Sequence, residues 1–346
     1  GGNEMADLTR RSAVGAVAAA LAAPALIGRA QAAARVLKIS HHFPASSGDT
    51  GDFRDRICHR WADLVTQKTG GSLEFQVYPN ASLMKTFAQI SGLRKGALDI
   101  GLIPLTYAGG EIHEMNITFM PAVVTSYAQG YNWRTHPIGK ALVSLLEEKG
   151  IILVSWMWQS GGMASRTRPL IMPADAKGMK IRGGSREMDE MFTAAGASVS
   201  SMPSNEIYVG MQTGVMDVAC TSSSSFLSFK LQEASKYLTT PGERSFFFIL
   251  EPIMVSKSIW VTLSSAEQEA MLAAGEEMIP FNLAGAKADD AELAKVYAAA
   301  GIEVTPLPND AVDAWQRVAR DSAWKIYADK TKLAAQMLKM AQDVPV

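Results

Sequence analysis

Apolar and polar positions alternate along the first part of the chain in two rhythms. Period-two patterns predict strands at residues 35–43 and 72–80. Apolar residues spaced three and four apart predict helices at 51–71 and 82–96. Because strands and helices alternate, we expect this half to be α/β with a largely parallel sheet.

The same pattern resumes near residue 150 and then becomes rich in helices. Strands are predicted at residues 150–158, 178–184, 198–203, 246–256 and 302–308. Helices are predicted at residues 186–197, 205–214, 264–301 and 310–342. Trp156 and Trp158 alternate on the first of these strands, so we expect both on one face. That face belongs either to the core or to the wall of a pocket.

One short pattern occurs twice. Gly96 and Asp99 follow a predicted helix and precede a short apolar strand, and Gly214 and Asp217 do the same at matching offsets. We expect each half of the molecule to present an equivalent strand end. Ligands of open α/β sheets bind beyond the carboxyl ends of strands, so two such ends facing one another predict a cleft.

Length and charge narrow the class of protein. A chain of 346 residues is long enough for about two domains. The net charge of −1, with basic residues dispersed along the chain, provides no positive field for nucleic acid. We therefore expect two lobes and no nucleic-acid partner.

The N-terminus predicts export. Arg10 and Arg11 precede an alanine-rich apolar run that ends in a small-x-small cleavage signature at 30–32. We interpret residues 1–33 as a signal peptide of the twin-arginine type with upstream residues, leaving a periplasmic protein that does not span the membrane. Cys58 and Cys220 are far apart in the sequence, and nothing in it brings them together as a disulfide.

Common catalytic and cofactor motifs are missing from the sequence. It contains no G-x-G-x-x-G, G-x-x-x-x-G-K-[ST], H-E-x-x-H, C-x-x-C or G-x-S-x-G. The adjacent His41 and His42 would point to opposite faces of a strand and could not share a metal. The run Thr221 to Ser225 is better explained as a polar turn that donates hydrogen bonds than as a nucleophile. We expect no enzyme, no cofactor and no metal.

Arg182 is the residue that most needs explanation. In the segment GMKIRGG, residues 178–184, it ends a short apolar strand and is followed by two glycines. The next acidic residue after it is Glu187. A buried guanidinium requires an anion. We infer that this anion belongs to a ligand.

Several segments together resemble the solute-binding proteins of tripartite ATP-independent periplasmic (TRAP) transporters that bind organic acids. They are KISHHFPASS, TGGSLEFQVYPNASLMK, LRKGALDIGLI, FMPAVV, PADAKGMKIRGG, AAGASVSSMPSNEIYVGMQTGVMD and IMVSKSIWVTLSSAEQEAML. The resemblance covers essentially all of the chain after the predicted signal peptide.

This resemblance implies a fold, a function and partners. The fold is two α/β lobes with a cleft between them, connected by strands and a long helix. We expect lobe I at 35–159 plus about 248–288, and lobe II at 160–247 plus about 289–346. The resemblance also implies closure on a carboxylate ligand and docking on a membrane permease, and it identifies Arg182 of the K-[IL]-R motif as the carboxylate-binding arginine.

Three positions depart from the pattern of this family. Gly162 stands where many members have a second arginine, Thr221 where many have an asparagine, and Ser204 where an aromatic residue is common. Arg166 or Arg168 could take the place of the missing arginine. These departures indicate that the protein is not of the sialic-acid type.

We therefore predict a receptor that holds an organic acid by an arginine–carboxylate clamp. The predicted ligand-binding residues are Arg182, Thr221, Ser222, Trp158, Tyr107, His42, Ser204, Phe226, Phe247 and Arg166. A monocarboxylate with an apolar or aromatic body is favoured over a C4-dicarboxylate or another oxo or hydroxy acid. Two alternatives remain: an exported hydrolase using His42 and a serine of 222–225, and a module for another ligand such as an amino acid or a metal-chelated acid.

Overall fold

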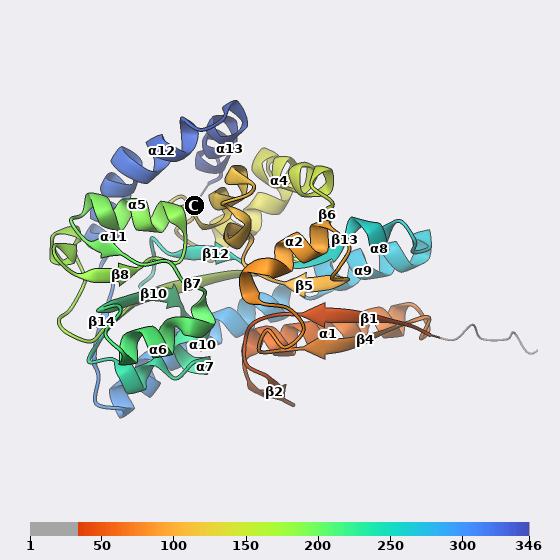
Figure 1. Ribbon diagram of the computed structural model, residues 1–346, viewed down its shortest axis with the longest axis horizontal. Helices are drawn as coiled ribbons and strands as arrows, with labels where there is room; N and C mark the ends of the chain where they lie inside the picture. Colours follow the sequence, from red (N-terminus) through yellow and green to blue (C-terminus); the bar gives the residue numbers. More distant parts are fainter. Residues whose placement is uncertain (1–33, 346) are drawn as a thin grey trace, which may run out of the picture. The chain divides into compact units, whose positions relative to one another are not determined.

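Two mixed sheets with flanking helices make up the part of the chain that the computed structural model describes, residues 34–345 (Figure 1). The α/β class predicted from the sequence is confirmed. The predicted signal peptide, residues 1–33, lies outside the described residues.

The first sheet has five strands. Their spatial order is β4 (Leu73–Tyr78), β1 (Arg35–Ser40), β5 (Ile100–Leu102), β13 (Ile253–Ser256) and β6 (Ile151–Leu153). Strand β1 is parallel to β4 and β5, whereas β13 is antiparallel to β5 and β6. The expectation of a largely parallel sheet therefore holds for one side of it only.

The second sheet is larger and is also mixed. Its spatial order is β14 (Glu303–Pro306), β11 (Tyr237–Thr240), β7 (Trp158–Ser165), β10 (Val218–Ser222), β8 (Lys180–Arg182) and β9 (Ser198–Val199), with β12 (Phe248–Leu250) paired to the start of β7. A separate small hairpin joins β2 (Ser46–Ser47) and β3 (Thr50–Gly51).

Two predicted strands are wrong because each is really a pair of strands in different sheets. Residues 150–158 contain the end strand β6 and the first residue of β7, and Trp156 lies between them. Trp156 and Trp158 therefore do not share a strand. Residues 246–256 contain β12 and β13, separated by Glu251 and Pro252, and Pro252 has no N–H to continue a ladder. At both places the chain crosses from one sheet to the other.

The helices fall between the strands and after them. The α-helices are α1 (Phe53–Lys68), α2 (Gln89–Arg94), α3 (Tyr127–Asn132), α4 (Pro137–Glu148), α5 (Arg186–Ala194), α6 (Ile207–Gln212), α7 (Ser223–Ser228), α8 (Lys257–Trp260), α9 (Ser265–Glu277), α10 (Ile279–Ala299), α11 (Asn309–Ala319), α12 (Lys325–Ala328) and α13 (Lys332–Gln342). Short 3₁₀ segments cover Thr86–Ala88, Leu105–Ala108, His113–Phe119, Trp133–Thr135, Pro173–Ala176, Ser204–Glu206 and Leu231–Ala234, and a π segment covers Arg320–Trp324.

Side-chain caps explain where several helices begin. Asp52 accepts a hydrogen bond from the backbone N–H of Arg54 at the start of α1, and Ser264 forms a capping box with Glu267 at the start of α9. The predicted helix 264–301 is two helices, because a break at Met278 separates α9 from α10, whose second residue is Pro280. The predicted run 310–342 is interrupted by the π segment and by residues 329–331.

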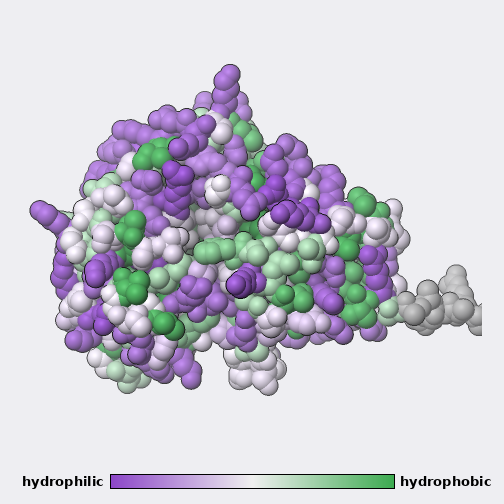
Figure 2. Space-filling model, viewed as in Figure 1, coloured by the Kyte–Doolittle hydropathy of each residue, from purple (hydrophilic) through white to green (hydrophobic). Residues whose placement is uncertain are grey.

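Apolar residues cover both faces of the first sheet. Along β13, Ile253 and Val255 pack in a cluster with Trp61 of α1, whereas Met254 packs in a second cluster with Leu142 of α4. This alternation follows from the period of two in a strand, and it explains why β13 is buried along its whole length. Figure 2 shows that the visible surface is mostly hydrophilic, with hydrophobic residues in small scattered groups.

The repeated glycine–aspartate pattern forms the same structure twice. Asp99 precedes β5 and accepts a hydrogen bond from the backbone N–H of Lys38 on the parallel neighbour β1, at 2.9 Å. Asp217 precedes β10 and accepts one from Lys180 on its parallel neighbour β8, also at 2.9 Å. The prediction of equivalent strand ends in the two halves is thus confirmed.

Candidate functional site

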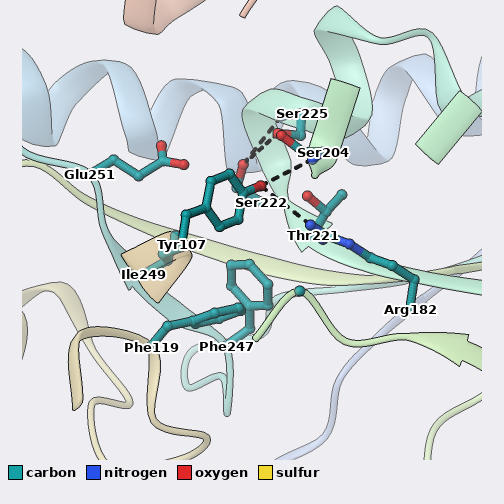
Figure 3. Close-up of a pocket in the computed structure, with 11 residues that line it drawn as sticks. Tyr107, Phe119, Arg182, Ser204, Thr221, Ser222, Ser225, Phe247, Ile249 and Glu251 are labelled. Atoms are coloured by element: carbon teal, nitrogen blue, oxygen red, sulfur yellow. Dashed lines mark hydrogen bonds between the residues drawn. The ribbon is translucent and has the colours of Figure 1, made fainter. Parts of the chain in front are cut away.

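A small cavity lies where segments that follow β5 meet the carboxyl ends of β8 and β10 (Figure 3). Its lining residues are Tyr107, Phe119, Arg182, Gly184, Ser204, Thr221, Ser222, Ser225, Phe247, Ile249 and Glu251. Its volume is about 10 Å³, which is room for about one water molecule. An organic acid would therefore fit only after lining side chains move apart.

Arg182 is buried in this cavity with neutral partners only. It is 3% exposed, and its Nε and Nη1 donate to the backbone oxygens of Met202 at 3.0 Å and Cys220 at 2.9 Å. Its Nη2 lies 3.4 Å from the hydroxyl of Tyr107. A guanidinium has five N–H groups, so donors remain. Within residues 34–345, no carboxylate lies within 4.0 Å of these nitrogens to form an ion pair.

The glycines after Arg182 make room for its side chain. Gly184 has φ of +95°, and a Cβ atom placed on it would lie 2.6 Å from Nη1 of Arg182. Any other residue there would be strained and would push the guanidinium away. The backbone N–H of Gly183 instead donates to Asp189 at 3.0 Å, which keeps this carboxyl group beside the loop.

Hydroxyl groups connect the two sides of the cavity. The hydroxyl of Tyr107, which follows β5, accepts a hydrogen bond from the backbone N–H of Ser204 at 3.0 Å. The hydroxyl of Ser204 lies 2.9 Å from Nε2 of His42, which follows β1. Burial, together with the nearby Arg54 cation, holds the pKa of His42 well below its ordinary value. His42 is therefore a neutral hydrogen-bonding partner behind the cavity.

A second buried arginine, Arg54, lies beside the cavity. It makes a bidentate pair with Asp52, at 3.0 and 2.7 Å, and its guanidinium lies 3.5 Å from the centroid of the Phe43 ring. Its Nη1 donates to the hydroxyls of Ser222 at 3.3 Å and Ser225 at 2.9 Å. Arg54 thus ties the first turn of α1 to β10 and α7.

Glu251 is the one carboxyl group that lines the cavity. It is 3% exposed, and its Oε2 has no hydrogen-bond partner, with Nη1 of Arg54 3.7 Å away. Burial raises the pKa of Glu251 to about 7, although the Arg54 cation opposes this shift. The group is therefore poised between its charged and neutral forms near neutral pH.

Apolar side chains form another wall. The rings of Phe119 and Phe247 meet edge to face with centroids 4.5 Å apart, and Ile249 of β12 adjoins them. Figure 3 shows the two phenyl rings together on one side of Tyr107. The cavity therefore combines one cation, one carboxyl group, several hydroxyls and an apolar wall.

Six of the ten predicted site residues line the cavity: Tyr107, Arg182, Ser204, Thr221, Ser222 and Phe247. Thr221 and Ser222 end β10, and Ser223 to Ser225 begin α7, so the predicted polar turn is a strand end and a helix start. His42 lies directly behind Ser204.

The other three predicted residues lie elsewhere. Trp158 is fully buried against Trp133, with ring centroids 5.1 Å apart, and Phe226 is fully buried against Tyr297. Arg166 follows the end of β7 beside the start of β10, because Ser165 pairs with Val218. The cavity lies at the other end of β10, about 13 Å further along the strand.

The missing second arginine of the family pattern has a steric explanation. Gly162 lies inside β7 and pairs with Thr221, and a Cβ on it would lie 2.0 Å from the backbone oxygen of Thr239. No side chain fits there without moving β11. Arg168 does not replace it, since this exposed residue bonds to the backbone oxygen of Lys177.

Arg54 and Glu251 carry only faint signals in the sequence. Glu251 is the single charge in the apolar run 246–256, and that isolation could have marked it. Arg54 follows a capping aspartate in an ordinary amphipathic helix, and its hydroxyl partners are 168 and 171 residues away in the chain. No local pattern reveals such contacts.

Two sheets contribute strand ends to one charged cavity, an arrangement that suits a solute-binding protein. The sequence profile of the bacterial extracellular solute-binding proteins, family 7, matches residues 53–330. The chain belongs to this family, which places it among the periplasmic solute-binding proteins of TRAP transporters.

Known relatives agree with this assignment. A solute-binding protein of Albidiferax ferrireducens is 51% identical over 306 residues, which are 88% of this chain and 90% of the relative. The C4-dicarboxylate-binding periplasmic protein DctP of Rhodobacter capsulatus is 28% identical over 257 residues, covering 73% and 74% of the two chains.

A crystal structure shows the same fold. A TRAP periplasmic solute-binding protein from Rhodoferax ferrireducens, with bound malonate, has 51% identity and a TM-score of 0.88. The match covers 89% of this chain and 98% of that one. The predicted two-lobed periplasmic solute-binding fold is confirmed by this likeness.

Membership of a receptor family argues against the alternative of an exported hydrolase. The relatives are solute-binding proteins, and Nε2 of His42 bonds to Ser204 rather than to a serine of 222–225. Across residues 34–345, no group of three His, Cys, Asp or Glu side chains could hold a metal ion. A search of the same residues finds no helix long and apolar enough to cross a membrane.

Proposed function

We propose that this protein is the receptor of a TRAP transporter that binds a small organic acid, with the ligand carboxylate on Arg182. The observation that carries the proposal is that Arg182 is buried, charged and surrounded by neutral acceptors. A carboxylate can accept two parallel hydrogen bonds from a guanidinium, and such charge-assisted bonds are about twice as strong as neutral ones. Arg182 is thus prepared for an anion that the described residues do not supply.

The ligand is a short acid. Arg182 and the apolar residues Phe119, Phe247 and Ile249 line the same cavity, so a body of a few carbon atoms would contact both sides once the lining side chains move apart. The relative with 51% identity was crystallised with malonate. We therefore propose an acid of about the size of malonate as the ligand class.

A monocarboxylate with an apolar or aromatic body remains a second candidate. Phe119, Phe247 and Ile249 form a continuous apolar wall that would contact such a body. Charged hydrogen bonds contribute roughly 1.5 to 3 kcal/mol each, while micromolar binding needs about −8 kcal/mol, so apolar contact must contribute. Thr221 and Ser222 would bond to the carboxylate or to a neighbouring hydroxyl.

Binding would close the lobes and present the closed form to the permease. We retain lobe I as 35–159 plus about 248–288, and lobe II as 160–247 plus about 289–346. The crossings between the sheets after β6 and between β12 and β13 support these boundaries. Contacts such as Tyr107 with Ser204 would form on closure, which follows the hinge mechanism of two-lobed receptors.

A thermal-shift screen tests the proposal. The purified protein is melted with a panel of short mono- and dicarboxylates, including malonate and aromatic acids, and each hit is repeated with Arg182→Ala. A bound acid should raise the melting temperature of the wild type but not of the variant, because ligand binding stabilises only a competent folded state. Arg168→Ala is the matched control, since Arg168 is exposed and lies outside the cavity.

The panel also separates the candidates. Shifts with malonate and similar diacids favour the short-acid proposal, whereas shifts confined to aromatic monocarboxylates favour the second candidate. Equal shifts in wild type and Arg182→Ala would contradict the carboxylate clamp for both.

A further inference from the structure

Glu251 and Arg182 line the same cavity. In Figure 3 the Glu251 carboxyl group and the Arg182 guanidinium approach from opposite sides of the Tyr107 ring. An acid held on Arg182 and long enough to extend past the Tyr107 ring would bring its second polar group to Glu251. This geometry gives the site two ends of different chemistry.

Glu251 is buried and has a carboxyl oxygen without a hydrogen bond, which costs free energy in the protein interior. It lies between β12 and β13 with 3% exposure, and its Oε2 has no hydrogen-bond partner. Nη1 of Arg54 lies 3.7 Å from this oxygen, within the range of an ion pair but beyond that of a hydrogen bond, and Arg54 also makes a bidentate pair with Asp52. A buried polar atom without a partner is rare and calls for an explanation such as a ligand.

The chemistry of a carboxyl group limits what can bind at Glu251. A hydroxyl on the ligand can donate a hydrogen bond to it directly. A second ligand carboxylate can approach only if the two carboxyl groups share one proton, since two negative charges at contact distance repel strongly. An apolar end would leave the Oε2 atom unpaired.

We propose that Glu251 is a specificity-determining residue that binds the second polar group of the ligand through a shared hydrogen, so that a dicarboxylate enters with one added proton. The inference rests on the proposed function, because it requires the first carboxylate to lie on Arg182. It predicts that the site prefers short hydroxy acids and diacids over simple monocarboxylates.

The charged and titratable groups around Glu251 come from several elements. Arg54 and Asp52 lie at the start of α1, and Arg182 and Tyr107 lie across the cavity. Asp289 of α10 and His42 interact with the charge of Arg54. Burial has the largest effect on the pKa of Glu251 and raises it, while Arg54 lowers this pKa and Asp52 raises it.

Calorimetric titration at two pH values tests the inference. Malonate, 3-hydroxypropionate and propionate are titrated into the full protein at pH 7.5 and pH 8.5. With the pKa of Glu251 at about 7, malonate must bring a proton into the complex, so its affinity should fall about tenfold over this pH unit. The affinities of the hydroxy acid and of propionate should stay constant, and propionate should bind most weakly.

Glu251→Gln is the informative variant. An amide donates to a carboxylate without taking up a proton, so the pH dependence for malonate should vanish while binding persists. Glu243→Gln, at an exposed residue, should retain the wild-type pH dependence. Circular-dichroism melting of both variants checks that they fold. The pH dependence of the wild type tests the inference even if a variant fails to fold.

Three results would overturn the inference: a malonate affinity that is constant with pH in the wild type, a pH dependence that survives in Glu251→Gln, or binding of propionate without malonate. Failure of the proposed function looks different. If Arg182→Ala binds all three acids as tightly as the wild type does, the clamp itself is wrong; if Arg182→Ala loses binding but the malonate affinity of the wild type is constant with pH, the clamp holds without a role for Glu251.

Discussion

Arg182 shows how a single residue can mark a binding site. Its strand is three residues long and buried apart from Lys180, its guanidinium bonds to two backbone oxygens, and Gly184 gives it space. The backbone bonds fix the plane of the guanidinium while leaving donors free. Because less side-chain entropy is then lost on binding, the fixed arginine is pre-organised for a carboxylate.

The buried carboxyl group of Glu187, away from the cavity, should contribute to the pH dependence of stability. Burial raises the pKa of Glu187 on α5 to about 8, well above its value in an unfolded chain. The folded state therefore binds more protons than the unfolded state between about pH 4.3 and 8, and stability falls as the pH rises through this window.

Glu187→Gln should remove that part of the pH dependence. We expect the variant to be more stable than the wild type at pH 8 by about 4 kcal/mol, and closer to it at pH 5. Urea unfolding at both pH values measures this difference. Glu190→Gln, a less buried neighbour on the same helix, is the control, and equal slopes in wild type and Glu187→Gln would show that Glu187 ionises normally.

Among the secondary-structure elements, α1 has the least expected role. Its first turn carries Arg54, which reaches Ser222 at the end of β10 and Ser225 in α7. A helix that packs on the first sheet thereby holds a strand end of the second. Such a buried arginine is costly to place in the interior and costly to remove once its partners surround it.

Arg54→Met should destabilise the protein by about 3 to 5 kcal/mol, since Asp52 and Glu251 would keep buried charge without compensation. Chemical denaturation measures the loss. Arg60→Met, at an exposed arginine of the same helix over the ring of Phe281, should cost far less. Equal losses in the two variants would mean that Arg54 contributes only through helix packing.

The two aspartates that precede β5 and β10 should act alike. Each accepts a hydrogen bond from the backbone of the neighbouring parallel strand, and bonds to charged groups contribute about 1.5 to 3 kcal/mol. Asp99→Ala and Asp217→Ala should each lose about this much stability in denaturant unfolding. The Asn variants, which keep an acceptor oxygen, should lose less; no difference between Ala and Asn would contradict the role of these bonds.

Elements with a strong local pattern could be predicted from the sequence, whereas their partners could not. The helix at α1 and the strands β1, β4 and β8 follow from periodicity and capping. The run 246–256 was predicted as one strand because its apolar residues are continuous, but Pro252 divides it between two sheets. Periodicity reports burial, and it does not report which sheet a strand joins.

The same limit applies to the site. Arg182 could be found because its sequence neighbours fail to neutralise it, a local signal. Trp158 and Phe226 were chosen for their chemistry, yet the fold uses both in the core. Arg54 and Glu251 come near one another only through a contact between residues almost two hundred positions apart. Long-range packing decides which residues meet at a strand end.

At the scale of the whole molecule, hydrogen bonds around the cavity join residues of the two sheets. His42 and Tyr107 from the first sheet reach Ser204, and Arg182 from the second reaches Tyr107. Helix α10 contacts α1 as well as β7 and β14. A ligand that joins this network would shift the equilibrium toward the closed arrangement. The size of the shift equals the difference between its binding free energies for the closed and open states.

The most direct test of the clamp is the affinity of the best acid from the screen for the wild type, Arg182→Ala and Arg168→Ala, measured by calorimetry. Loss of one partner from a buried charged pair costs about 2 to 5 kcal/mol. Arg182→Ala should therefore bind at least about thirtyfold more weakly, with Arg168→Ala unchanged. An affinity of Arg182→Ala within about threefold of the wild type would contradict a carboxylate held by Arg182.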